Sequence, residues 1–144
     1  MQKNAICSQN APAAIGPYSQ GICVNGIIAL SGQLPIDPTV GKIVQGGIRE
    51  QTEQSLRNVE AILAQADLTV DNIIKTTVYL ADIGDFAAMN EVYARHIPAP
   101  YPARSAFQVA ALPMGALVEI EVLCVRGEIP TADMLPGGAC GCGG

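Results

Sequence analysis

Length, composition and charge already limit what this chain can be. It has 144 residues, of which 49% are hydrophobic and 15% charged, enough for one domain with its own core. Eight basic and thirteen acidic residues give a net charge of −5, and a field of that sign repels phosphate backbones and anionic lipid. The composition therefore argues against nucleic-acid binding and against binding at a membrane surface.

The sequence shows neither a membrane span nor a signal peptide. Its apolar runs are short, residues 116–125 contain two glutamates, and residues 1–10 lack an apolar stretch. The five cysteines follow no recognised disulfide spacing, which agrees with a reducing compartment. Cys140 and Cys142 could bind a soft metal, but no third or fourth ligand lies nearby, so we expect no metal there. We therefore expect a cytoplasmic protein.

A hairpin precedes the first helix in the expected order of elements. Asn25-Gly26 stands between two apolar runs, which is a strong hairpin signal. Ser31-Gly32 interrupts the second run, as a bulge or a close approach to the backbone would. The expected elements are an extended entry over residues 1–15, strands over 22–24 and 27–34, a turn over 35–41 and a short strand over 42–44.

Two helices are predicted by apolar residues that recur at steps of three and four. The first spans residues 48–66, and its stripe consists of Ile48, Thr52, Leu56, Val59, Ile62, Leu63 and Ala66. Glu53 and Arg57 lie four residues apart, and we expect them on its solvated side. Asp82 can cap the second helix. Its buried stripe consists of Phe86, Met89, Val92 and Tyr93. His96 ends this helix, where an imidazole beside the last carbonyls is an ordinary structural choice.

Strands are expected again in the second half of the chain, at residues 73–80, 104–109 and 117–125. Three prolines between residues 98 and 102 favour a stiff, extended connection ahead of the second of these strands. Residues 128–144 are rich in glycine and have little to bury. We therefore expect a flexible tail that follows a domain of residues 1–127.

The resulting order predicts an α+β domain with two helices on one face of a mixed sheet. A chain of this length has no third helix to cover the opposite face of the sheet. Neighbouring copies of the chain would cover it, so we expect a homo-oligomer.

Arg104 is the first candidate for a functional site. Lys75 and Arg104 are the basic residues within the longer predicted strands, and Arg104 follows the stiff proline segment. A guanidinium in such a place can hold a carboxylate through two parallel hydrogen bonds. Spacing alone favours a plainer alternative, in which Arg104 pairs with Glu119 or Glu121 on an adjacent strand.

Glu119 and Glu121 are two residues apart on the last strand, so both side chains point to the same face. The core then takes Val118, Ile120, Val122 and Cys124. A partly buried carboxyl with a raised pKa suits acid–base chemistry, whereas a solvated strand face needs no function. Because we expect the Arg104 strand to run beside them, a mixed arginine–glutamate site and a plain solvated face both stay open.

Four further residues are weaker candidates. Tyr18 and Ser31-Gly32 could line an anion pocket, although a turn tyrosine and a strand bulge are ordinary structural features. Asn90 lies in the second helix, where a surface amide is usual. The glycine-rich phosphate motifs and the Gly-x-Ser-x-Gly nucleophile motif are missing from the sequence, so no nucleotide cofactor is indicated.

Several ordered blocks resemble the RidA family (reactive intermediate deaminase A, older name YjgF). The blocks are APAAIGPYSQ at 11–20, SGQLP at 31–35, QSLRNV at 54–59, KTTVY at 75–79, PARS at 102–105, LP at 112–113 and VEIE at 118–121. The resemblance spans residues 8–126. It implies a chorismate-mutase-like fold and a homotrimer with sites between subunits. It also implies hydrolysis of imines and enamines of 2-amino acids to a 2-keto acid and ammonia, without a metal or cofactor.

By matching position, the resemblance assigns Arg104 to the substrate carboxylate and Glu119 to the attacking water. The positions that match the pocket are Tyr18, Ser31, Gly32 and Asn90. Ala106 stands where the family often has a cysteine, so a thiol is not available there. The proline-rich loop ahead of Arg104 is a few residues shorter than in bacterial members, which would reshape the mouth of the pocket.

Two alternatives to the deaminase stay open. An endoribonuclease activity is attached to some members of the family, and the acidic composition argues against it. A binding module for small 2-keto acids or for other proteins, without turnover, would use the same pocket.

Overall fold

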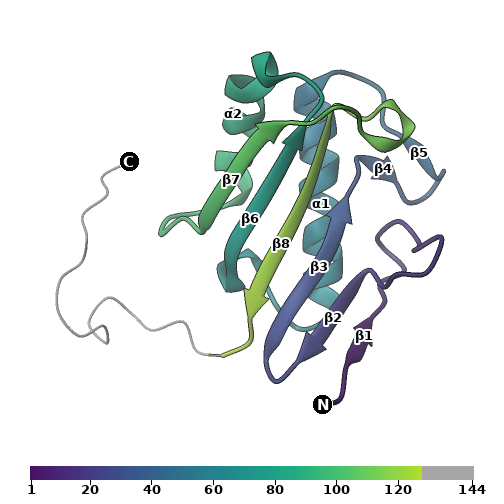
Figure 1. Cartoon of the computed structure of the whole chain (residues 1–144), viewed down its shortest axis with the longest axis vertical. Coiled ribbons are helices and arrows are strands. Elements are labelled where there is room, and N and C mark those ends of the chain that lie inside the picture. Colours follow the sequence, from purple (N-terminus) through teal and green to yellow (C-terminus); the bar gives the residue numbers. More distant parts are fainter. Residues whose placement is uncertain (128–144) are drawn as a thin grey trace, which may run out of the picture.

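The computed structural model describes residues 1–127, which form a β-sheet with two helices on one of its faces (Figure 1). The α+β class expected from the order of elements is confirmed. The predicted flexible tail over residues 128–144, including Cys140 and Cys142, lies outside the described residues.

Most strands and helices lie close to their predicted positions. The main sheet contains β1 (Asn4–Ile6), β2 (Gly21–Val24), β3 (Ile27–Gln33), β6 (Ile73–Leu80), β7 (Ala103–Gln108) and β8 (Val118–Val125). Two short strands, β4 (Ile36–Asp37) and β5 (Lys42–Ile43), pair separately. The helices are α1 (Ile48–Gln65) and α2 (Phe86–His96). Short 3₁₀ turns cover Val70–Asn72, Ile83–Asp85 and Pro113–Gly115.

The main sheet is mixed, and its strand order is β1-β2-β3-β8-β6-β7. β6 and β7 are parallel and are joined through α2, whereas the other neighbouring strands of this sheet are antiparallel. β6 therefore lies between β7 and β8. This order matters for the site, because the strand that carries the candidate arginine is not adjacent to the strand that carries the two glutamates.

The predicted hairpin and bulge are both confirmed. Asn25 and Gly26 have φ angles of 49° and 81°, the left-handed pair that a tight two-residue hairpin requires. The register of β3 against β8 shifts between Leu30 and Gln33, which places an irregularity at Ser31-Gly32. The irregularity interrupts the ladder at the level of the two glutamates of β8.

Three local predictions differ from the structure. Asn4–Ile6 pairs with β2 as an edge strand, where the sequence predicts an extended entry without a strand, and Ile36–Asp37 forms a strand inside the predicted turn. Both segments are too short to show an alternating pattern. Asp82 accepts a hydrogen bond from the backbone N–H of Gly84, so it caps the 3₁₀ turn ahead of α2 and not α2 itself.

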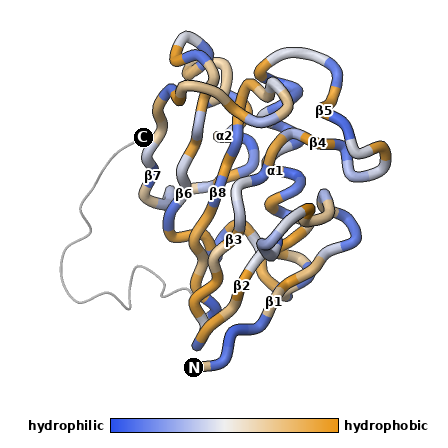
Figure 2. The backbone as a smooth tube through the Cα atoms, turned by 45° about the vertical axis from the view of Figure 1, so that its right-hand side comes forward, coloured by the Kyte–Doolittle hydropathy of each residue, from blue (hydrophilic) through white to orange (hydrophobic). Residues whose placement is uncertain are grey.

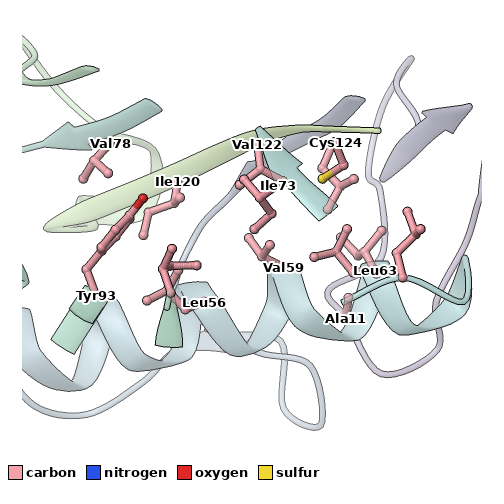
Figure 3. Packing of buried hydrophobic residues seen from close by; sticks show 14 of the residues in the cluster. Ala11, Leu56, Val59, Leu63, Ile73, Val78, Tyr93, Ile120, Val122 and Cys124 are labelled. Carbon is pink, nitrogen blue, oxygen red and sulfur yellow. The ribbon is translucent and has the colours of Figure 1, made fainter. Parts of the chain in front are cut away.

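The core lies between α1 and the sheet (Figure 3). Side chains of α1 face those of β8 across it, among them Leu56, Val59, Ile120 and Val122. Most of the predicted helical stripes are buried, whereas Ile48 and Phe86 are only partly buried. Each fully buried leucine or isoleucine contributes about 1.5–3 kcal/mol. Figure 2 shows hydrophobic residues along the strands of the sheet and hydrophilic residues concentrated in the loops.

A histidine joins the two helices. Nδ1 of His96 lies 2.7 Å from a carboxylate oxygen of Glu60, and its Nε2 lies 2.6 Å from one of Glu53. The expectation that His96 contacts the last carbonyls of its own helix is therefore wrong. Glu53 was expected on the solvated side of α1, but its carboxylate contacts the histidine between the two helices. Burial lowers the pKa of His96, but the two carboxylates outweigh it and the net shift of the pKa is upward. Both nitrogens can donate only when the ring carries both protons.

The face of the sheet opposite the helices, called the open face below, is not covered by any helix of residues 1–127 (Figure 1). Ile27, Phe107 and Val125 are partly exposed there. Their face follows from register, since Ile27 pairs with Val125 and Phe107 pairs with Tyr79. An apolar sheet surface of this kind is typical of an interface. Within residues 1–127, no helix has both the length and the apolar character that crossing a bilayer requires.

Candidate functional site

Arg104 lies near the start of β7, and its side chain contacts α2. Its Nη1 donates a hydrogen bond to Oδ1 of Asn90 at 2.6 Å. The guanidinium carbon lies 4.8 Å from the ring centroid of Tyr93 and 5.4 Å from that of Phe86. These three α2 residues are spaced four and three apart, so a single stripe of the helix holds the cation.

The contacts of the Arg104 guanidinium are all with uncharged groups. None of the ion pairs within residues 1–127 involves it, and its side chain is half-buried. The alternative in which Arg104 pairs with Glu119 or Glu121 is therefore wrong. A guanidinium has five N–H donors, so it keeps donors for a further acceptor.

A cavity of about 460 Å³ opens beside the guanidinium. It is lined by Asn90, Tyr93, Ala94, Tyr101, Pro102 and Arg104. Two of these residues come from the proline-rich segment ahead of β7, which brings that segment opposite α2. A cavity of this size, lined by one cation and one amide together with aromatic and aliphatic side chains, suits a small anionic molecule.

The two glutamates lie on the open face, whereas Arg104 does not. Glu121 pairs in register with Thr77 of β6, and Arg104 pairs with Thr76. Successive side chains of a strand point to opposite faces, so Glu121 and Arg104 lie on opposite faces of the sheet, and Glu119 shares the face of Glu121. The shared face of the two glutamates is confirmed. The expectation that the Arg104 strand runs beside them is wrong.

Glu119 lies against the bulge of β3. A Cβ atom on Gly32 would overlap the carboxylate of Glu119, so the absence of a side chain at this position makes room for it. Burial raises the pKa of Glu119, and the charge of Glu121 raises it further. A carboxyl group with a raised pKa is a better proton acceptor than an ordinary glutamate, which suits acid–base chemistry.

Glu121 has a partner of its own. It accepts a hydrogen bond of 2.7 Å from the hydroxyl of Tyr79, and this bond together with burial raises the pKa of Tyr79 to about 12. The ring of Phe107 packs edge-on against Tyr79, with 5.5 Å between centroids. The carboxylate of Glu119 has no hydrogen-bond partner among residues 1–127, so it is the one available to a ligand.

The remaining pocket candidates lie near the bulge and in the loop before β2. The hydroxyl of Ser31 donates a hydrogen bond to the carbonyl of Ser19 at 2.6 Å. Tyr18 is 52% exposed and lines a separate cavity of about 510 Å³. The structure therefore brings the candidates together in two groups, Arg104 with Asn90 and Glu119 with Gly32 and Ser31.

The cysteines of residues 1–127 are free and lie outside both groups. Burial raises the pKa of Cys124 to about 12, so this thiol stays protonated and behaves as a small apolar group. In the described part of the chain, no three His, Cys, Asp or Glu side chains are arranged to hold a metal ion.

Sequence reasoning missed the aromatic residues around Arg104. Periodicity assigns Phe86 and Tyr93 to the packed stripe of α2, and both also contact the guanidinium. Their spacing from Asn90 could have indicated this role, because Phe86, Asn90 and Tyr93 are four and three residues apart and so lie along one side of the helix.

Comparison with known proteins identifies the family. The family described as Endoribonuclease L-PSP matches residues 8–126. The 2-iminobutanoate/2-iminopropanoate deaminase of Capra hircus is 48% identical over 92% of this chain and 96% of that protein. The chain belongs to this family. The human protein of the same name is 45% identical over the same shares, and the chloroplastic Reactive Intermediate Deaminase A of Arabidopsis thaliana is 46% identical over 85% of this chain and 66% of that protein. The resemblance to RidA is confirmed.

Solved structures of the RidA family share the fold. RidA from the Antarctic bacterium Psychrobacter sp. PAMC 21119 is 41% identical, with a TM-score of 0.82 over 85% of this chain and 99% of that one. TdcF of E. coli with bound serine is 43% identical, with a TM-score of 0.81 over 86% of this chain and 99% of that one. Ala106 of this RidA-family chain follows Arg104 on the same face of β7 and packs against the core.

Proposed function

We propose that this chain is a 2-iminobutanoate/2-iminopropanoate deaminase, which hydrolyses reactive imines and enamines of 2-amino acids to a 2-keto acid and ammonia. The observation that carries the proposal is the Arg104 guanidinium, which faces a cavity and has only uncharged partners among residues 1–127. Relatives 45–48% identical over most of the chain have this name, which supports the substrate class.

The active form is a homotrimer with a chorismate-mutase-like arrangement and sites between subunits. Arg104 and Glu119 lie on opposite faces of one sheet, so a single copy cannot bring both to one small molecule. A second copy could supply the missing group. The apolar side chains on the open face, Ile27, Phe107 and Val125, support burial against neighbouring copies.

Arg104 binds the carboxylate of the substrate through two parallel N–H donors. Asn90 and the two rings hold the cation without neutralising it, so the site needs little reorganisation when the substrate arrives. Fixing the carboxylate also fixes the neighbouring imine carbon, which lowers the entropic part of the barrier.

Glu119 activates the attacking water. Glu119 takes one proton from the water as the water oxygen bonds to the carbon of the N-protonated imine. The electron pair of the C=N double bond moves to nitrogen. Glu119 then returns the proton to that nitrogen. The C–N bond breaks, and the new hydroxyl gives its proton to the departing ammonia and becomes the carbonyl of the 2-keto acid. One water is consumed, and one 2-keto acid and one ammonium ion are formed.

The other pocket residues have positioning roles. Gly32 makes room for the Glu119 carboxylate. Ser31 is next to Gly32 and donates a hydrogen bond to the carbonyl of Ser19, which follows Tyr18, so we assign Ser31 and Tyr18 to the Glu119 side of the pocket. Asn90 holds the guanidinium on the other side. This hydrolysis needs neither a metal nor an organic cofactor, and it uses no thiol at the position of Ala106.

The test is ammonia release from 2-iminobutanoate that a threonine dehydratase generates in the same cuvette. We expect the protein to speed release beyond the spontaneous rate. Arg104→Lys should raise the apparent KM on the order of tenfold, because a point charge cannot reproduce the two-pronged contact. Arg57→Lys is the matched control, since Arg57 forms an exposed ion pair with Glu53. No acceleration by the wild type, or full activity in Arg104→Lys, would contradict the proposal.

The family description provides a second candidate, endoribonuclease activity. A net charge of −5 opposes binding of RNA. Digestion of generic RNA by the purified, metal-free protein, abolished in Arg104→Ala, would favour this candidate. A binding module without turnover would instead bind 2-oxobutanoate and leave the rate of ammonia release unchanged.

A further inference from the structure

The neighbours of Arg104 form a closed circuit of contacts. Thr76 is the register partner of Arg104 in the parallel pair of β6 and β7. The hydroxyl oxygen of Thr76 lies 2.8 Å from that of Tyr93, and the ring of Tyr93 lies 4.8 Å from the guanidinium carbon. Arg104, Thr76 and Tyr93 are therefore linked to one another by three contacts: strand pairing, a hydroxyl–hydroxyl hydrogen bond and a cation–π contact.

This circuit is shielded from water. Thr76 is 0% and Tyr93 5% exposed, and Figure 3 shows the Tyr93 hydroxyl pointing from α2 toward the sheet. Water therefore does not compete for the hydroxyl pair, and the low local dielectric strengthens the bond. Burial raises the pKa of Tyr93, so the phenol keeps its proton at neutral pH.

The hydrogen bond from Arg104 to Asn90 does not by itself fix the guanidinium. A single bond at Nη1 leaves the group free to turn about that contact. The ring of Tyr93 restricts this turning, because a cation over a ring face is held at a defined distance from it. The ring can do so only if its own position is fixed, and the contact with Thr76 ties it to the sheet.

We infer that Tyr93, tethered by Thr76, is a positioning residue that keeps the guanidinium of Arg104 aligned with the cavity for carboxylate binding. The inference deepens the proposed deaminase and rests on it for the role of Arg104. The hydroxyl of Thr76, a buried residue on β6, then affects substrate binding only indirectly, through Tyr93 and Arg104, and does not contact the substrate.

Two conservative variants test the tether in the coupled assay. Thr76→Val and Tyr93→Phe each remove one hydroxyl and keep the shape of the side chain. Each should raise the apparent KM for 2-iminobutanoate about three- to tenfold, the range for weakening a desolvated cation–π contact, and change kcat less than about twofold. Thr76→Ser restores a hydroxyl and should return KM toward the wild-type value. The double variant should be no worse than the worse single variant, because both remove the same contact.

A second readout does not depend on activity. The ¹⁵N–¹H NMR signals of the Arg104 side chain report whether its guanidinium rotates. We expect hindered rotation in the wild type and faster rotation in Thr76→Val and Tyr93→Phe. Thr52→Val is the matched control, because Thr52 is also fully buried but its hydroxyl has no partner in the described part of the chain. It should leave both KM and the NMR signals unchanged.

The two readouts separate the inference from the proposed function. Faster rotation in both variants, with no deaminase activity in the wild type, would support the tether and overturn the deaminase. Unchanged rotation and unchanged KM in both variants would overturn the tether, whatever the activity. If circular dichroism shows that Tyr93→Phe does not fold, Thr76→Val and Thr76→Ser decide the question from the sheet side of the same contact.

Discussion

Arg104 illustrates how one side chain can be kept ready for an anion. The loss of hydration of a partly buried guanidinium is normally offset by a carboxylate partner. Here an amide oxygen and two ring faces replace part of that hydration. A carboxylate from the same chain would have to be displaced before a substrate could bind, and none contacts Arg104 within residues 1–127. The attraction of the cation is thus left for the ligand.

The environment of Glu119 predicts a pH dependence for the reaction. Burial and then the charge of Glu121 raise the pKa of Glu119. A base must be ionised to act, so kcat/KM should fall as the pH drops through this raised pKa, at a higher pH than for an exposed glutamate. Glu121→Gln removes the charge that raises this pKa, and the acid limb should move to lower pH.

The measurement is kcat/KM between about pH 4 and pH 8, with the dehydratase in excess at every pH. Glu119→Gln is the companion variant, because it removes the titrating group and should abolish the limb together with most of the activity. A limb at the same pH in the wild type and in Glu121→Gln would show that another group titrates.

Gly32 provides a prediction about space rather than charge. In Gly32→Ala the new methyl group would overlap the Glu119 carboxylate, which must swing away. Because the displaced atoms are the end of a flexible side chain, we expect the free energy of unfolding to change by less than about 1 kcal/mol. Displacing the base should lower kcat about 10- to 100-fold.

Gly21→Ala is the control for this substitution, because its added Cβ would meet its nearest neighbours at an ordinary 3.5 Å. Both variants are compared with the wild type by urea unfolding and by initial rates of ammonia release. Full activity in Gly32→Ala would show that Glu119 does not act as the base in the reaction.

At the scale of elements, the sequence predicted best those segments with a long, regular pattern. The prediction places α1 at residues 48–66 and β6 at 73–80, and the structure has them at Ile48–Gln65 and Ile73–Leu80. Their apolar residues repeat often enough to define a period. β1 and β4 escaped prediction, because strands of two or three residues are determined by the neighbours with which they pair.

The site was predicted only in part for a related reason. Alternation within β8 correctly put Glu119 and Glu121 on one face. Arg104 was expected beside them, because strands that follow one another often pair. In the structure β7 pairs instead with β6, through the crossover over α2, and its arginine faces the helices. The pattern of one strand states which of its residues share a face, but not which strand lies next to it.

The contact between His96 and α1 predicts a pH-dependent stability. The folded pKa of His96 is raised, so its contribution is complete below the unfolded value of about 6.5 and is lost as the pH rises through the folded value. The pKa of Glu53 is lowered, chiefly by its hydrogen bond with His96, so its contribution is present above about 4.5 and is lost as the pH falls through the folded value. The contact therefore stabilises most between these two values.

Thermal unfolding at pH values of about 6 and about 9 tests this contact. The midpoint of the wild type should be lower at the higher pH by about 2–4 °C, the shift for a loss near 1 kcal/mol, and His96→Gln should show a smaller difference. Glu91→Gln is the control, because the ion pair between Arg49 and Glu91 also joins α1 to α2 but contains no imidazole. A wild-type midpoint that rises between these pH values would contradict the assignment.

At the scale of the whole molecule, the two groups of site residues impose a requirement on assembly. Arg104 faces the helices and Glu119 faces the open side, so in one copy the sheet separates them. A head-to-tail contact would place the Arg104 group of one copy against the Glu119 group of the next. If the rotation between copies closes, such a contact forms a ring, and in the proposed trimer every copy would contribute to two sites.

This requirement predicts complementation between two inactive variants. Arg104→Ala keeps Glu119, and Glu119→Gln keeps Arg104, so each variant alone lacks one group at every site. When equal amounts are unfolded together and refolded at random, about one quarter of all sites combine both intact groups. Activity should therefore return to about one quarter of that of the wild type refolded in the same way.

The comparison distinguishes a shared site from a site within one chain. If Arg104 and Glu119 of the same copy acted together, every chain in the mixture would still lack one of them, and mixing would restore nothing. Native mass spectrometry of the refolded mixture should show assemblies of three chains. Complementation requires an assembly, because Arg104 and Glu119 can be combined only from different copies. Recovered activity in a species with the mass of a single chain would contradict the shared site, since no second copy would be present to complete it.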